Sequence, residues 1–272
     1  MPIATLDPAE LAYDALARAY DVLTADYDHA AWLSAIERVA IAHGLVGRRV
    51  LDVACGTGKS FLPLLERGYD VTACDISEAM LRVARAKVGS RASLRRLDMR
   101  ALPALGRFDL VTCLDDALNY LPDEGALAQA LTGMRANLAP GGVLVFDVNA
   151  LRTYRGSFAA DWVVDGDDCM IAWRGQTASD LAPGGSAELL LDAFVRGSDG
   201  AGWTRHRAVH RQFHHTTERL DRALARAGLA LRARLGQLPG ALLEDGFSEL
   251  DHAKALYIAA HPRGGAEMIA RP

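Results

Sequence analysis

The feature that most constrains this chain is the stretch at residues 50–60, which reads VLDVACGTGKS. Apolar residues around Asp52 predict a short buried strand, the glycine turn at residues 56–58 ends it, and a helix is expected from Lys59. Glycine suits such a turn because a backbone without Cβ can bend sharply and approach a ligand closely. A strand, a glycine turn and a helix form the first half of a βαβ unit, so the stretch predicts an α/β fold with a ligand at the turn.

Two nucleotide-binding patterns come close to this turn without matching it. A P-loop requires G-x-x-x-x-G-K-[ST]; Gly58, Lys59 and Ser60 match its end, but its first glycine would fall at Val53. The dinucleotide pattern G-x-G-x-x-G fails at Phe61, where the third glycine is required. What remains is an acidic residue inside the strand before the glycines, which suits a positively charged ligand better than a pyrophosphate.

From residue 50 to residue 149, strand-like and helix-like segments alternate. Strands are expected near 50–55, 70–75, 93–97, 108–114 and 143–148, and helices near 59–67, 78–87 and 124–138. This alternation implies a parallel, doubly wound sheet, in which ligands bind beyond the carboxyl ends of the strands. Gly56, Asp75, Asp98 and Asp115 lie at or just past predicted strand ends, so one pocket should collect them.

The chain before this core reads as helical over residues 8–43. Tyr13, Tyr20 and Tyr27 recur every seven residues, which would put them on one side of a single continuous helix. Such an aromatic stripe either packs on the core or faces a ligand, and the spacing does not decide between the two.

The chain after Asn149 changes in character. Short apolar segments between Gly- and Asp-rich turns predict an antiparallel sheet over residues 161–213. An amphipathic helix is expected at 216–229. The last two strands, at 229–236 and 254–262, are expected to pair as an antiparallel hairpin at the edge of the main sheet.

Together these segments predict an α/β fold, with a doubly wound, mostly parallel, seven-stranded Rossmann-like sheet, an N-terminal helical cap and a small antiparallel β insertion. The expected divisions are a cap at 1–46, a ligand-binding core at 47–150, a substrate-side insertion at 151–215, completion of the core sheet at 216–262 and a mobile tail at 263–272.

Composition limits the partners. Lys and Arg number 30 and Asp and Glu 34, so the net charge of −4 provides no basic field to attract nucleic acid. The four cysteines show no CxxC spacing, which indicates small core residues in a reducing compartment. The first residues lack an export signal, and no apolar run approaches the ~20 residues of a membrane span. We therefore expect a cytoplasmic protein without a membrane contact; a homo-oligomer is compatible with the sequence.

The segment LDVACGTG resembles the first motif of class I S-adenosylmethionine (SAM)-dependent methyltransferases. The resemblance continues through YDVTACD, LDM, FDLVTCLDDALNYL and LAPGGVLVFDVN, in that order. It implies SAM as the cofactor, S-adenosylhomocysteine (SAH) as the product, and Asp75 as the residue that binds the ribose hydroxyls. The residues assigned to the cofactor on this basis are Tyr20, Asp52, Ala54, Gly56, Thr57, Gly58, Asp75, Ile76, Met80, Asp98, Met99 and Leu114.

The motif order and the short insertion resemble glycine N-methyltransferase-like and amino-sugar N-methyltransferase enzymes that act on small molecules. In such enzymes an N-terminal helix with a Tyr-Asp pair, here Tyr20 and Asp21, closes over SAM and the acceptor. Tyr27 and Trp32 would extend this wall.

Two groups of residues are candidates for handling the acceptor. Asp115 and Asp116 follow a strand. They could orient or deprotonate an acceptor amine, or they could instead cap the next turn. His206 and His210 share one strand face but stand ~13 Å apart at ~3.3 Å per residue, too far to bind one metal. They are either surface residues or bases facing the acceptor. The resulting candidates are His210, Asp116 and Tyr20 for catalysis, Tyr27, Trp32, Asp115, Asn119 and His206 for the substrate, and none for a metal.

The sequence therefore predicts methyl transfer from SAM to a small-molecule acceptor in bacterial specialised metabolism. Nitrogen is the favoured acceptor atom, followed by oxygen and then aromatic carbon. The alternatives are an RNA methyltransferase, which the acidic composition disfavours, and a SAM-binding regulatory protein without catalysis. The interpretation as an NTPase is supported by the incomplete P-loop alone.

Overall fold

A computed structural model describes residues 7–197, 200 and 202–262. The predicted tail at 263–272 lies outside the described residues. In the described part of the chain, no helix is long and apolar enough to cross a membrane.

The main sheet has the strand order β11-β10-β12-β5-β4-β1-β2-β3. Its parallel part is formed by β1 (Arg49–Val53), β2 (Asp70–Asp75), β3 (Ser93–Arg96), β4 (Phe108–Cys113) and β5 (Leu138–Asn149). The expected hairpin of β10 (Ala230–Leu238) and β12 (Lys254–Ala260) is confirmed, and β12 also pairs antiparallel with β5. The short edge strand β11 (Leu242–Asp245) makes this an eight-stranded sheet rather than the seven expected; its four residues gave no alternating pattern.

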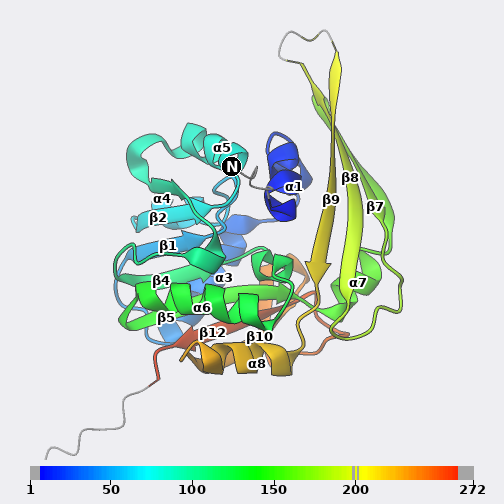
Figure 1. Cartoon of the computed structure of the whole chain (residues 1–272). Helices are drawn as coiled ribbons and strands as arrows, with labels where there is room; N and C mark the ends of the chain where they lie inside the picture. Colours follow the sequence, from blue (N-terminus) through cyan, green and yellow to red (C-terminus); the bar gives the residue numbers. More distant parts are fainter. Residues whose placement is uncertain (1–6, 198–199, 201, 263–272) are drawn as a thin grey trace, which may run out of the picture.

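Helices cover both faces of this sheet (Figure 1), and an apolar layer of side chains lies under each set. On one face α6 (Glu124–Asn137) and α8 (Thr217–Arg226) bury side chains against β4, β5 and β12. On the other face lie α3 (His29–Ala42), α4 (Leu62–Glu66) and α5 (Glu78–Val88). Helix α4 begins three residues later than predicted, because Gly56 and Gly58 adopt positive φ angles and turns fill the interval.

The N-terminal segment is not one continuous helix, so the heptad argument for the tyrosines was wrong. It forms α1 (Pro8–Leu16), α2 (Tyr20–Leu23) and α3. The Thr24 hydroxyl donates to the Tyr20 carbonyl where α2 ends, and the Asp28 carboxylate accepts from the Ala31 amide where α3 begins. Asp and Thr favour such local bonds over helix continuation.

A second sheet stands beside the first, as predicted (Figure 1). It consists of β6 (Asp161–Asp165), β7 (Cys169–Gly175), β8 (Ser186–Arg196) and β9 (Trp203–Phe213), all paired antiparallel in sequence order. The short helix α7 (Leu151–Gly156) connects it to β5. Helix α1 lies between α5 and β9, so the N-terminal segment bridges the two sheets above the strand ends (Figure 1).

Candidate active site

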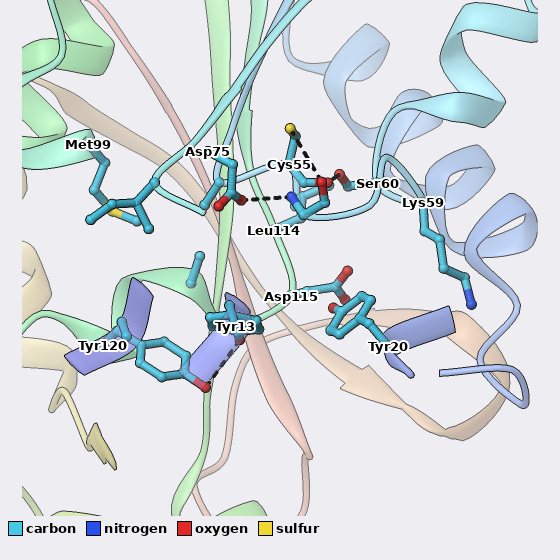
Figure 2. A pocket seen from close by; sticks show the side chains of 15 residues that line it. Tyr13, Tyr20, Cys55, Lys59, Ser60, Asp75, Met99, Leu114, Asp115 and Tyr120 are labelled. Atoms are coloured by element: carbon cyan, nitrogen blue, oxygen red, sulfur yellow. Dashed lines mark hydrogen bonds between the residues drawn. The ribbon is translucent and has the colours of Figure 1, made fainter. Parts of the chain in front are cut away.

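The glycine turn and the end of β2 are held together by one carboxylate. Asp75 Oδ2 accepts a hydrogen bond of 2.8 Å from the Gly56 amide (Figure 2). Its Oδ1 accepts one of 2.8 Å from the Ser77 amide. Burial raises the pKa of Asp75, while the amides of Ser77 and Gly56 favour its charged form. Each oxygen keeps a lone pair for a further donor.

A hollow of about 590 Å³, which we call the cofactor hollow, opens beside this carboxylate. Gly56 has φ +53°, and a Cβ built there would meet no atom within 4 Å, so the backbone faces open space. The lining residues, most of them shown in Figure 2, are Ala9, Tyr13, Tyr20, Ala54, Cys55, Gly56, Lys59, Ser60, Asp75, Ile76, Met99, Leu114, Asp115, Ala117 and Tyr120.

Four residues assigned to the cofactor lie behind this hollow. Asp52 is fully buried, and its carboxylate accepts from the Ser60 and Thr112 hydroxyls at 2.5 Å each. It therefore ties β1 to the turn and to β4, and burial raises its pKa to about 7. Thr57 donates to Asp21, and Met80 is a core residue. At Gly58 a Cβ would meet the Phe61 ring at 3.0 Å, so internal packing at φ +90° requires a glycine there.

Asp98 lies in an adjoining hollow of about 420 Å³, which it shares with Ala54, Ile76 and Met99. Its carboxylate accepts from the Arg100 amide at 2.8 Å and pairs with the Arg100 guanidinium. Arg100 also pairs with Asp7, the N-cap of α1. Asp98 thus anchors the N-terminal segment to the rim as well as bordering the hollow.

A second hollow of about 890 Å³, the acceptor hollow, adjoins the cofactor hollow. Both are lined by Tyr13, Tyr20, Asp115 and Tyr120, which form the junction between them. Figure 2 shows these four side chains together at one end of the cofactor hollow. The other residues of the acceptor hollow come from both sheets and include Asp116, Asn149, Trp162, Trp173, His210, Gln212 and Lys254.

Four predicted substrate residues lie outside the acceptor hollow. Trp32 is 0% exposed and packs in the core, and the Tyr27 hydroxyl accepts from Gln237 at 2.8 Å. Asn119 is also fully buried; it donates to the Phe213 carbonyl and accepts from the Asn149 amide. His206 shares the face of His210 but lies four residues before it on β9. Of these four, Trp32 and Asn119 are fully buried.

His210 is in place in the acceptor hollow, in a specific hydrogen-bonded chain. The Tyr13 hydroxyl donates to Tyr120 at 3.1 Å, and Tyr120 Oη lies 2.8 Å from His210 Nδ1. Burial lowers the pKa of His210 to about 4, so the ring is neutral near pH 7. With Nδ1 accepting from Tyr120, the ring proton sits on Nε2, which has no partner among the described residues.

The two aspartates after β4 adopt the left-handed conformation, with φ 57° at Asp115 and 54° at Asp116. Such angles are uncommon outside glycine and cluster at functional sites. Lys254 Nζ lies 2.8 Å from Asp116 Oδ1, 2.8 Å from Asp147 Oδ2 and 4.0 Å from Asp115 Oδ1. Burial alone would lower the pKa of Lys254, but Asp116, Asp147 and Asp115 raise it well above its usual value. Asp116 Oδ2 accepts from Gln212 at 2.6 Å.

Sequence reasoning missed Lys254, Asp147, Gln212, Tyr13 and Tyr120 as site residues. Lys254 is the one with a readable signal, because it begins the apolar strand KALYIAA and a lysine there must find a partner once buried. The partner itself, more than a hundred residues away in the chain, could not be read from the sequence.

The cofactor hollow has the features that a SAM molecule requires. Asp75 offers two lone pairs for a diol, Gly56 lets the backbone approach, and the apolar Met99 and Ile76 border the space beyond. Asp115 faces the junction, where a carboxylate stabilises a positively charged group. Burial alone would raise the pKa of Asp115, but the hydrogen bond with His29 and the charge of Lys254 hold it below its usual value.

Comparisons with known proteins agree with this geometry. A family model described as a methyltransferase domain matches residues 50–142. A putative methyltransferase of Geobacillus sp. (strain WCH70) is 32% identical over 226 residues, which cover 81% of this chain and 90% of that protein. The crystal structure of an S-adenosylmethionine-dependent methyltransferase from Clostridium acetobutylicum ATCC 824 has a TM-score of 0.76 at 25% identity, covering 92% of this chain and 98% of that one.

A third relative is named for its substrate. The dTDP-3-amino-3,6-dideoxy-alpha-D-glucopyranose N,N-dimethyltransferase of Streptomyces fradiae is 29% identical over 193 residues, which cover 70% of this chain and 72% of that enzyme. From the fold, the hollow and these matches, the chain belongs to the class I SAM-dependent methyltransferases. It is an enzyme whose cofactor is SAM.

Proposed function

We propose that the enzyme methylates the nitrogen of a small-molecule amine, with an amino sugar as the first candidate and bacterial specialised metabolism as its setting. The observation that carries this proposal is the carboxylate of Asp115 at the junction of the two hollows. An ionised carboxylate there attracts an ammonium group to the point where the donor methyl is expected. The amino-sugar relative supports the same substrate class.

The charges of the acceptor hollow also favour a cation. Asp115, Asp116 and Asp147 surround the single ammonium group of Lys254. The aromatic rings of Trp162 and Trp173 stack at 4.7 Å on the opposite wall and give an apolar body of the acceptor a surface to pack on. A polar wall facing an aromatic wall suits a compact amine with an apolar or ring-shaped body.

SAM supplies a methyl group that is already activated by the positive charge on sulfur. An acceptor bound as an ammonium ion releases one proton to solvent before its nitrogen lone pair attacks the methyl carbon, the C–S bond breaks and SAH leaves. The protein's main contribution is to hold the acceptor in line, because proximity and orientation dominate such a displacement. Tyr20, which borders both hollows, closes the junction in this proposal. The hydroxyl of Tyr20 stays protonated, since burial raises its pKa well above the usual value.

We propose positioning as the main role of His210 and Asp116. The pKa of about 4 makes His210 a weak base at pH 7, and both oxygens of Asp116 already accept hydrogen bonds, from Lys254 and Gln212. His210→Ala should then act mainly on KM for the acceptor and leave SAM affinity unchanged. A loss of about 100-fold in kcat would instead identify a general base.

A screen with methyl-labelled SAM tests the proposal. The panel should contain free and nucleotide-linked amino sugars, glycine, simple phenols and bulk RNA, each with a no-enzyme control. Label in an amine is the expected result. Label confined to RNA or phenols would overturn the amine assignment, and tight SAH binding without transfer to any member would favour a SAM-binding protein without catalysis.

A further inference from the structure

His29, the first residue of α3, stands directly behind Asp115 and lines neither hollow. Its side chain is 6% exposed. Nδ1 lies 3.0 Å from the Tyr27 carbonyl oxygen, and Nε2 lies 3.2 Å from Asp115 Oδ2. The Tyr27 ring packs edge-on against the imidazole at 4.8 Å, which fixes its plane.

Both neighbours of this imidazole are hydrogen-bond acceptors. A carbonyl oxygen never donates, and an ionised carboxylate only accepts. A neutral imidazole carries one N–H, so one of its nitrogens would then direct a lone pair at an oxygen lone pair. The contacts on both sides are satisfied if His29 carries two protons, or if Asp115 carries the proton instead.

The surrounding charges decide between these two arrangements. Asp115 Oδ1 has Lys254 Nζ at 4.0 Å, and the charge of Lys59 also favours the ionised carboxylate. Burial alone would raise the pKa of Asp115, but the hydrogen bond with His29 and the charges of Lys254 and Lys59 together hold it below its usual value. The proton therefore belongs on His29. Among the described residues, the other titratable groups that act on the pair include Asp52, Asp116, Asp147, Tyr20 and Tyr27.

The charge balance of this cluster has a direct consequence for the acceptor. Three carboxylates, Asp115, Asp116 and Asp147, face two cations, Lys254 and protonated His29, which leaves one negative charge. One ammonium group from the acceptor would neutralise it. Asp115 Oδ1 is the oxygen available for that contact, because Oδ2 is bound to His29.

The backbone does not hold Asp115 in this orientation by itself. Its left-handed φ of 57° is strained for a non-glycine residue, so side-chain contacts must maintain it. The contact that fixes the carboxylate plane is the one with His29.

We propose that His29, protonated on both ring nitrogens, is a positioning residue that fixes Asp115 so that Oδ1 binds the ammonium group of the acceptor. The binding role of Asp115 Oδ1 rests on the proposed amine acceptor. The protonation state of His29 does not depend on that proposal.

Nitrogen NMR of the ¹⁵N-histidine-labelled enzyme tests the protonation state without any acceptor. The His29 signals are assigned by their loss in His29→Gln. We expect two protonated ring nitrogens at pH 7 in the wild type and a neutral ring in Asp115→Asn. A neutral His29 in the wild type at pH 7 would overturn the proposal, whatever the acceptor proves to be.

Kinetics with the amine that the labelled screen identifies test the positioning role. His29→Gln retains an N–H donor toward Asp115, so its kcat/KM at pH 7 should stay within about threefold of wild type. His29→Ala should lose at least tenfold in kcat/KM while SAH affinity, measured by calorimetry, is unchanged. Equal losses in both variants would contradict the role.

Discussion

The two hollows are built in different ways. The cofactor hollow is framed mainly by the glycine turn and the strand ends between residues 54 and 120, with Gly56 and Asp75 as its central contact and N-terminal residues as a cover. The acceptor hollow is assembled from side chains that are far apart in the chain, such as Tyr20, Asp116, His210 and Lys254. A backbone-framed site is preserved when side chains change, whereas a side-chain-built site can be altered one residue at a time. The same fold can therefore keep its cofactor while its acceptor changes.

The largest effect is expected for Lys254→Met, which removes the cation shared by three carboxylates. Leaving buried charges without their partner costs ~3–5 kcal/mol of unfolding free energy. The control is Lys87→Met, because Lys87 pairs with Asp21 near the surface, where a pair contributes below ~1 kcal/mol. Chemical denaturation measures both variants. At a temperature where the Lys254→Met variant is folded, its SAH affinity should match that of wild type. A large loss of SAH affinity would contradict the separation of the two hollows.

Gly56→Val should abolish cofactor binding, because its side chain would project into the space of the cofactor hollow. We expect SAH affinity to fall at least ~100-fold, or ~3 kcal/mol. Gly89→Val is a matched control, since Gly89 has a similar φ of +57° and open surroundings but lies after α5. Calorimetry should find normal SAH affinity in the control. Equal weakening in both variants would show that backbone strain, rather than occupation of the hollow, is responsible.

Asp52→Asn should change the pH dependence of stability but not the cofactor hollow. The pKa of Asp52 is about 7 in the folded protein and 3.8 in the unfolded chain. Protonated Asp52 therefore stabilises the fold fully below pH 3.8, and this stabilisation is lost as the pH rises through 7. Asp147, with a pKa raised to about 6, acts in the same direction, whereas His210 acts in the opposite one. The fall in unfolding free energy from pH 5 to pH 8 should shrink by ~2 kcal/mol in Asp52→Asn. An unchanged slope would show that Asp52 is ionised when buried.

The sequence could predict the fold and the place of the cofactor hollow because both depend on local signals. Alternating strand and helix patterns located β1 to β5, and strand ends collect ligand contacts in such sheets. A motif does not say which of its side chains face the ligand. Asp52 and Met80 belong to the segments that carry the pattern but point into the core.

The acceptor hollow could not be predicted to the same degree. The spacing of Tyr13, Tyr20 and Tyr27 had meaning only on one helix, and capping by Thr24 and Asp28 divides that segment. His206 and His210 share a strand face, but of these two only His210 lines the acceptor hollow. The partners of Asp116 depend on long-range packing, and no local pattern encodes it.

The division of labour between the hollows is tested most directly by titrating SAH into wild type, Asp75→Ala and His210→Ala side by side in one calorimetric series. Asp75→Ala should weaken SAH about 30-fold, or ~2 kcal/mol, as expected for charge-assisted hydrogen bonds lost from a buried site. His210→Ala should bind SAH within twofold of wild type. His210 lines the acceptor hollow and is not among the described residues that line the cofactor hollow. A change below twofold in Asp75→Ala, or an equal loss in both variants, would contradict the account.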